Sequence, residues 1–77
     1  MKRKYTLRFD DTKNKWVLKH DATEKIIRVF KSKEDGTRAG VLRKLLGQQG
    51  GTVIIRTRTG VFDEERNFPQ VQRMVRS

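Results

Sequence analysis

The chain has 77 residues, of which 19 are lysine or arginine and 9 are aspartate or glutamate, so its formal net charge is +10. It contains no cysteine, which excludes a disulfide framework and a thiolate metal site. A chain of this length forms one domain with a small core, because it buries only about 60% of the surface that its unfolded form exposes.

Three strands are predicted in the first part of the chain. Residues 4–9 alternate between polar and apolar side chains, which is the pattern of a strand with one buried face. Residues 16–20 and 26–30 form two further apolar segments that favour strands. The polar connections 10–15 and 21–25 are short, so we expect consecutive strands to pair antiparallel.

The spacing of the apolar residues then changes to that of a helix near residues 32–47. Ser32 is the expected N-cap, and Asp35, three residues further on, forms a weakened capping box with it. Glu34 and Asp35 place negative charge in the first turn, where the helix dipole favours it. Apolar side chains follow at helical spacing at Ala39, Leu42, Leu45 and Leu46.

Glycines lie both within this predicted helix and at its end. Gly36 and Gly40 each cost roughly 1 kcal/mol relative to alanine inside a helix. A close approach of the helix to the sheet would explain Gly40. Either Gly47 or the Gly50-Gly51 pair ends the helix.

A fourth strand is predicted over residues 52–58, followed by a turn at Thr59-Gly60. Val61 and Phe62 begin a short fifth strand. The polar run 63–66 breaks the apolar pattern, and Pro69 prevents simple continuation of a strand. The tail 70–77 is predicted to be a short helix or a frayed end, with Val71, Met74 and Val75 at helical spacing.

The order β-β-β-α-β, with a short fifth strand as an option, predicts a two-layer α+β fold. In this fold one helix covers one face of a small, mainly antiparallel sheet. The chain is expected to be a single domain over residues 1–77, with any fraying at 1–3 and 70–77. We see no internal repeat and no interdomain linker.

Alternation along each strand predicts which side chains face the helix. The third strand is ambiguous: either Ile27 and Val29 point inward with Arg28 outward, or Phe30 is the core residue. Elsewhere the inner residues are predicted to be Tyr5, Leu7, Phe9, Trp16, Leu18, Val53 and Ile55. Trp16, Leu42, Leu45 and Ile55 are expected in one core.

The opposite face of the sheet is predicted to be basic and free of acidic residues. If Arg28 points outward, this face carries Lys4, Arg8, Lys19, Arg28, Arg56 and Arg58. Like charges on one face repel each other, and an anionic backbone lying over them would relieve that repulsion and release counterions. The alternative is a solvated outer face, because a one-sided sheet needs polar residues there in any case.

A second basic segment lies in and after the predicted helix. No acidic residue occurs between Gly36 and Phe62. Arg38, Arg43 and Lys44 fall in this stretch, but they do not form one stripe on a helical wheel. We interpret them as a solvated surface first and as secondary phosphate contacts second.

No pattern of catalytic or metal-binding residues is found. His20 is the only histidine, and without cysteine it cannot make a structural zinc site. The run Asp63-Glu64-Glu65 lacks the spacing of a calcium loop, and Gly50-Gly51 is not followed by the Gly-Lys-Ser/Thr of a phosphate-binding loop. We therefore expect a protein that is not an enzyme and that has no cofactor and no metal.

The charge excess points to a polyanionic partner, most commonly nucleic acid. We predict a small non-catalytic module that binds nucleic acid mainly through backbone phosphates, with DNA favoured over RNA. One alternative is a protein-interaction module that docks on an acidic protein surface, and another is a self-associating structural domain. A homodimer is as plausible as a monomer, with Val61, Phe62 and the tail residues Val71, Met74 and Val75 as shared apolar groups.

No membrane is expected among the partners, since no apolar run approaches the ~20 residues of a membrane span. The basic N-terminus looks like the start of a signal peptide, but Arg8, Asp10 and Asp11 interrupt the hydrophobic segment that should follow. A cytoplasmic location is therefore expected, and the lack of cysteine fits a reducing compartment.

The chain resembles a family of short bacterial and phage domains of unknown function. The likeness covers residues 5–69 and rests on a Trp16-Val17-Leu18 strand, a Phe30-Lys31-Ser32-Lys33-Glu34 helix start, a Gln49-Gly50 helix end and a final strand near Gly60. It implies a fold and no activity. Residues 14–46 also look like the sheet-to-helix turn of the AP2-like arm-binding domains of phage integrases. That second resemblance implies DNA binding through a three-stranded sheet.

Overall fold

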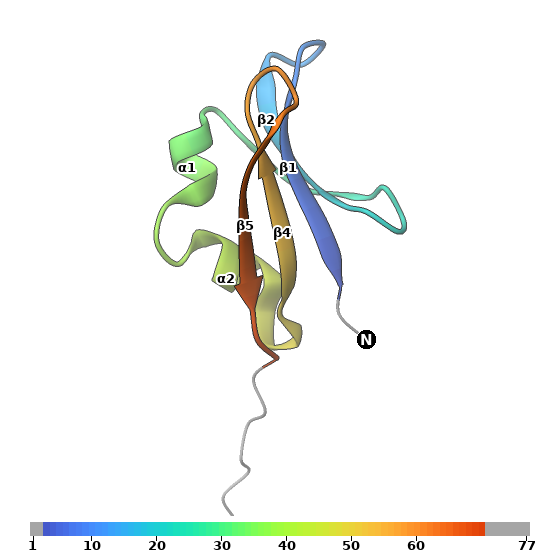
Figure 1. Ribbon diagram of the computed structural model, residues 1–77, viewed down its shortest axis with the longest axis vertical. Helices are drawn as coiled ribbons and strands as arrows, with labels where there is room; N and C mark the ends of the chain where they lie inside the picture. The colour runs from blue at the N-terminus through green and yellow to red at the C-terminus, as the bar shows by residue number, and fades with distance from the viewer. Residues whose placement is uncertain (1–2, 71–77) are drawn as a thin grey trace, which may run out of the picture.

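The computed structural model describes residues 3–70 as one layer of five strands and one layer of short helices (Figure 1). The α+β class predicted from the sequence is confirmed. The elements in chain order are β1 (Lys4–Asp10), β2 (Lys15–His20), β3 (Ile26–Phe30), α1 (Lys33–Thr37), α2 (Val41–Leu46), a 3-10 turn η1 (Gly47–Gln49), β4 (Gly51–Arg56) and β5 (Phe62–Phe68).

The sheet has the strand order β3-β2-β1-β4-β5, with β1 at its centre. The pairs β1–β2, β2–β3 and β4–β5 are antiparallel, whereas β1 and β4 are parallel. The sheet is therefore mixed, a feature that the prediction of a mainly antiparallel sheet did not specify. The parallel pair arises because the helical layer carries the chain from the edge strand β3 back to the centre, a crossover that parallel neighbours require.

Two short helices take the place of the single helix predicted over residues 32–47, and Figure 1 shows both on the same side of the sheet. Ser32 caps α1 as expected: the backbone N–H of Asp35 donates to its hydroxyl at 3.1 Å. The helix then ends, because Arg38 is extended and Gly40 has a φ of +86°. A left-handed backbone favours glycine, so Gly40, the N-cap of α2, allows the chain to turn into the second helix.

The glycine that lies close to the sheet is Gly36, so a close approach of helix to sheet does not explain Gly40. A Cβ on Gly36 would lie 3.0 Å from Cδ2 of Phe30 and 3.2 Å from Cδ2 of Leu7. A Cβ on Gly40 would meet nothing within 4 Å. Gly36 is therefore small because α1 packs directly on the core. Gly40 is glycine because its backbone has a positive φ.

The core lies between the helices and one face of the sheet. It comprises Tyr5, Leu7, Trp16, Leu18, Phe30, Leu42, Leu46, Val53 and Ile55. This confirms the predicted burial of Trp16, Leu42 and Ile55, while Leu45 is half-buried against the cluster. Phe30 is the core residue of β3, so the second of the two options for that strand is correct.

Strand β5 runs through the acidic segment that was predicted to interrupt it. It pairs with β4 from Gly51 opposite Phe68 to Arg56 opposite Phe62. An edge strand keeps one solvent-facing side and tolerates charge there. This segment is therefore a strand because its backbone pairs with β4, although its side chains do not alternate between apolar and polar. The predicted helix or frayed end over 71–77 lies outside the described residues.

Candidate functional site

The site begins with the face of the sheet that the helices leave uncovered. Leu7 points into the helix-side core, so Thr6 and Arg8, its neighbours in β1, point to the other face. Paired residues in a ladder share a face. Thr6 pairs with Lys19 on one side and with Ile54 on the other, and Arg8 pairs with Val17.

Four of the six basic residues predicted for this face come together in one open hollow. Arg8 comes from β1, Lys19 from β2, Arg56 from β4, and Arg58 from the turn that follows β4. The other lining residues are Thr6, Phe9, Asp11, His20, Asp21, Glu24, Thr59 and Gly60. The hollow therefore gathers cations from three strands and a turn that lie far apart in the sequence.

The expectation of an acid-free face was wrong. Asp11, Asp21 and Glu24 also line the hollow, and Glu65 pairs with Ile54, which places it on the same face. The first three lie in the connections between strands. Strand alternation places only strand residues, so it could not show that the turns bring carboxylates to this face.

The turn between β2 and β3 is tied to the sheet at this face. The hydroxyl of Thr6 donates to Asp21 Oδ1 at 2.8 Å, and the backbone N–H of Asp21 donates to the carbonyl of Lys4 at 2.9 Å. In the same turn, the backbone N–H of Thr23 donates to His20 Nδ1 at 3.3 Å. His20 is therefore a strand-end residue that holds a turn.

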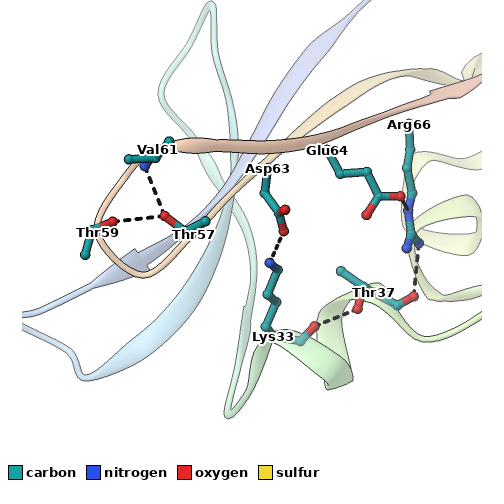
Figure 2. A network of polar contacts seen from close by, with 8 residues as sticks. All are labelled: Lys33, Thr37, Thr57, Thr59, Val61, Asp63, Glu64 and Arg66. Atoms are coloured by element: carbon teal, nitrogen blue, oxygen red, sulfur yellow. Dashed lines mark hydrogen bonds and ion pairs between the residues drawn. The ribbon is translucent and has the colours of Figure 1, made fainter.

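The turn between β4 and β5 contains Arg58 and is closed in part by Arg56. The backbone N–H of Thr57 donates to the carbonyl of Val61 at 2.7 Å, and Arg56 Nη1 donates to the carbonyl of Gly60 at 3.1 Å. The hydroxyl of Thr57 lies 3.0 Å from that of Thr59 and accepts from the backbone N–H of Val61 (Figure 2). Arg56 thus closes its own turn.

Arg28 and Lys4 do not lie in the hollow. Arg28 pairs with Leu18, whose side chain is in the core, so the register places Arg28 on the helix side of the sheet and corrects its predicted position. Lys4 shares the open face through its pairing with Thr52. It lines a second hollow, which has His20 and Asp21 in common with the first.

The secondary basic residues lie in the other layer. Arg38 follows α1 and pairs with Asp35 at 3.2 Å, while Arg43 and Lys44 are exposed on α2. Because both helices lie on one side of the sheet, these three residues cannot act together with the hollow on a single short ligand.

Acidic residues of β5 pair with basic residues of the same chain, a role that the sequence did not reveal. Lys33 of α1 pairs with Asp63, and Arg66 Nε donates to Glu64 at 2.8 Å (Figure 2). Arg66 Nη1 also donates to the carbonyl of Thr37 at 3.0 Å. The Lys33–Asp63 and Arg66–Thr37 contacts connect β5 to α1. No rule of sequence spacing predicts contacts between residues about thirty positions apart.

Within residues 3–70 no three His, Asp or Glu side chains gather as they would around a metal ion. None of the helices described there is long and apolar enough to cross a membrane. Comparison with protein-family models, with curated proteins and with solved structures finds no match to this chain. The two family resemblances therefore stay predictions.

Proposed function

We propose that this protein is a non-catalytic module that binds nucleic acid through the uncovered face of its sheet. The observation that carries the proposal is the meeting of Arg8, Lys19, Arg56 and Arg58 in one hollow. A net charge of +10 attracts a polyanion over long range, and guanidinium groups match the oxygens of phosphate. The hollow then supplies the short-range contacts.

The carboxylates limit where a phosphate backbone can lie. Asp11, Asp21 and Glu24 belong to turns, whereas Arg8, Lys19 and Arg56 belong to strands. We therefore expect the phosphates to follow the basic side chains and to avoid the β1–β2 and β2–β3 connections, which carry these carboxylates. Contacts to phosphate do not distinguish one base from another, so the affinity is expected to depend on salt concentration much more than on nucleotide sequence.

A fluorescence-anisotropy titration at two salt concentrations tests this function. The probes are a labelled DNA duplex and a labelled single-stranded RNA, each about 20 nucleotides long. With four phosphate contacts, the association constant should fall on the order of a hundredfold between about 50 mM and about 200 mM salt. Absence of binding to both probes at the lower salt would refute the proposal and favour docking on an acidic protein surface.

Association with a second copy is a further candidate, because an apolar pair lies exposed at the start of β5. Val61 and Phe62 are 61% and 55% exposed, and β5 is an edge strand with an unpaired side. Exposed apolar groups next to an unpaired strand favour pairing with another chain. The tail residues that were predicted to share this surface lie outside the described part of the chain.

We expect light scattering at high micromolar concentration to give the mass of a dimer, and Phe62→Ser to lower it to that of a monomer. Val29→Ser is the matched control, because Val29 is 40% exposed on β3, the edge strand at the other side of the sheet. A monomer mass for the unchanged protein, or an equal effect of both substitutions, would remove the dimer proposal.

A further inference from the structure

A guanidinium group lies over an aromatic ring among the residues that line the hollow. Phe9 lies near the end of β1. The centroid of its ring is 5.6 Å from that of the Trp16 ring, and the two rings meet edge-on. The guanidinium carbon of Arg58 lies over the ring of Phe9, 4.4 Å from its centroid. The Phe9 ring is thus held between a buried indole and a cation from the turn after β4.

The geometry leaves Arg58 accessible to a ligand. Arg58 is exposed, and it lines the hollow together with Arg8, Lys19 and Arg56. None of the ion pairs found within residues 3–70 involves Arg58. A guanidinium group that rests on a ring has its second flat face available for another planar group.

We infer that Arg58, supported by Phe9, is a stacking surface for one unpaired base, and that the preferred ligand is therefore single-stranded. This inference rests on the proposed function of the hollow. The bases of single strands stack on aromatic side chains and on arginine guanidinium planes. In a duplex the faces of the bases are already stacked on one another, so only the phosphates reach Arg58.

The placement of the neighbouring cations fits a base flanked by phosphates. Arg8 and Arg56 line the same hollow as Phe9 and Arg58, although Arg8 and Phe9, as neighbours in β1, point to opposite faces of the sheet. A strand whose base rests on Arg58 would have its own phosphates near these two residues. The stack then adds affinity for a base to a site whose other contacts are to phosphate.

Three labelled probes of about 20 units separate base from phosphate binding: oligothymidylate, its duplex with oligoadenylate, and an abasic oligomer with the same phosphates. We expect the protein to bind oligothymidylate on the order of fivefold or more tightly than the abasic oligomer. Arg58→Lys keeps the charge and removes the planar group. It should abolish that preference and leave the affinity for the abasic oligomer unchanged.

Two further variants secure the interpretation. Arg43→Lys makes the same chemical change on α2 and should leave the preference intact. Phe9→Leu removes the supporting ring and should reduce the preference as Arg58→Lys does, provided that thermal unfolding shows the variant to be folded. If no probe binds at low salt, the proposed function fails and this inference with it. If oligothymidylate and the abasic oligomer bind equally well, phosphate binding stands and the stacking surface is refuted.

Discussion

Replacing Gly50 by alanine is expected to destabilise the fold more than any other single change at a glycine in the helix-to-β4 connection. Gly50 has a φ of +65° and a ψ of −154°, a combination that is almost restricted to glycine. A Cβ there would lie 2.2 Å from the carbonyl oxygen of Phe68 and 2.7 Å from that of Pro69. Both are backbone atoms, so neither can rotate away as the end of a side chain would.

Gly47 provides a control with the same backbone geometry. Its φ and ψ are +68° and −154°, but a Cβ on it would meet nothing within 4 Å. Gly47→Ala should therefore lower the free energy of unfolding only by the strain of the backbone, about 1–3 kcal/mol. Gly50→Ala should lower it by roughly 2 kcal/mol more, because steric overlap is added.

Urea unfolding followed by the fluorescence of Trp16 measures both variants, since Trp16 is the only tryptophan and is 8% exposed. A small domain has only about 5–15 kcal/mol of stability in total, so Gly50→Ala is expected to come close to unfolding at ambient temperature. Equal losses for the two substitutions would show that β5 does not pack against this connection as the structure has it.

The strands could be predicted because their signal is local. In β1 the side chains of Tyr5 and Leu7 alternate with polar residues, and the face that they define is the buried one. The capping of α1 by Ser32 could be predicted for the same reason, since cap and partner lie three residues apart. Each of these predictions depends only on residues close in the chain.

The break in the helix and the length of β5 depend on tertiary structure. The single predicted helix assumed that Gly40 continues a right-handed helix, whereas Gly40 has a positive φ and is the N-cap at which the second helix begins. In β5 the residues Asp63 and Glu64 carry no strand pattern, yet Glu64 pairs with Ile55 of β4 and Asp63 contacts Lys33 of α1. Sequence spacing carries no information about such partners.

The candidate site could be predicted in part. Alternation correctly placed Arg8 of β1 and Lys19 of β2 on the same face of the sheet. It also placed Arg56 of β4, the parallel neighbour of β1, on that face. It failed for Arg28 because the parity of β3 was open, and the sequence allowed both options. It also missed Asp21, which reaches the face through a turn.

Removing Arg56 and Arg58 together is expected to weaken nucleic-acid binding more than any other pair of substitutions. Both line the hollow, Arg56 from β4 and Arg58 from the turn after it. The salt dependence of binding to the abasic oligomer, on which Arg58 can contact only phosphate, should fall by about 1.4 in the log–log slope, since each lost phosphate contact removes about 0.7. At about 50 mM salt this corresponds to a loss of affinity on the order of fiftyfold.

The matched control for Arg56→Ala with Arg58→Ala is Arg43→Ala with Lys44→Ala, which removes the same charge from α2 in the other layer. Because both double variants carry the same net charge, long-range attraction is equal and only the position of the lost cations differs. Arg56 also donates to the carbonyl of Gly60, so thermal unfolding must show that the turn variant is folded, with a stability loss within about 0.5–1.5 kcal/mol. Equal losses of affinity for the two variants would mean that nucleic acid responds to the overall charge of the protein and not to the hollow on the open face of the sheet.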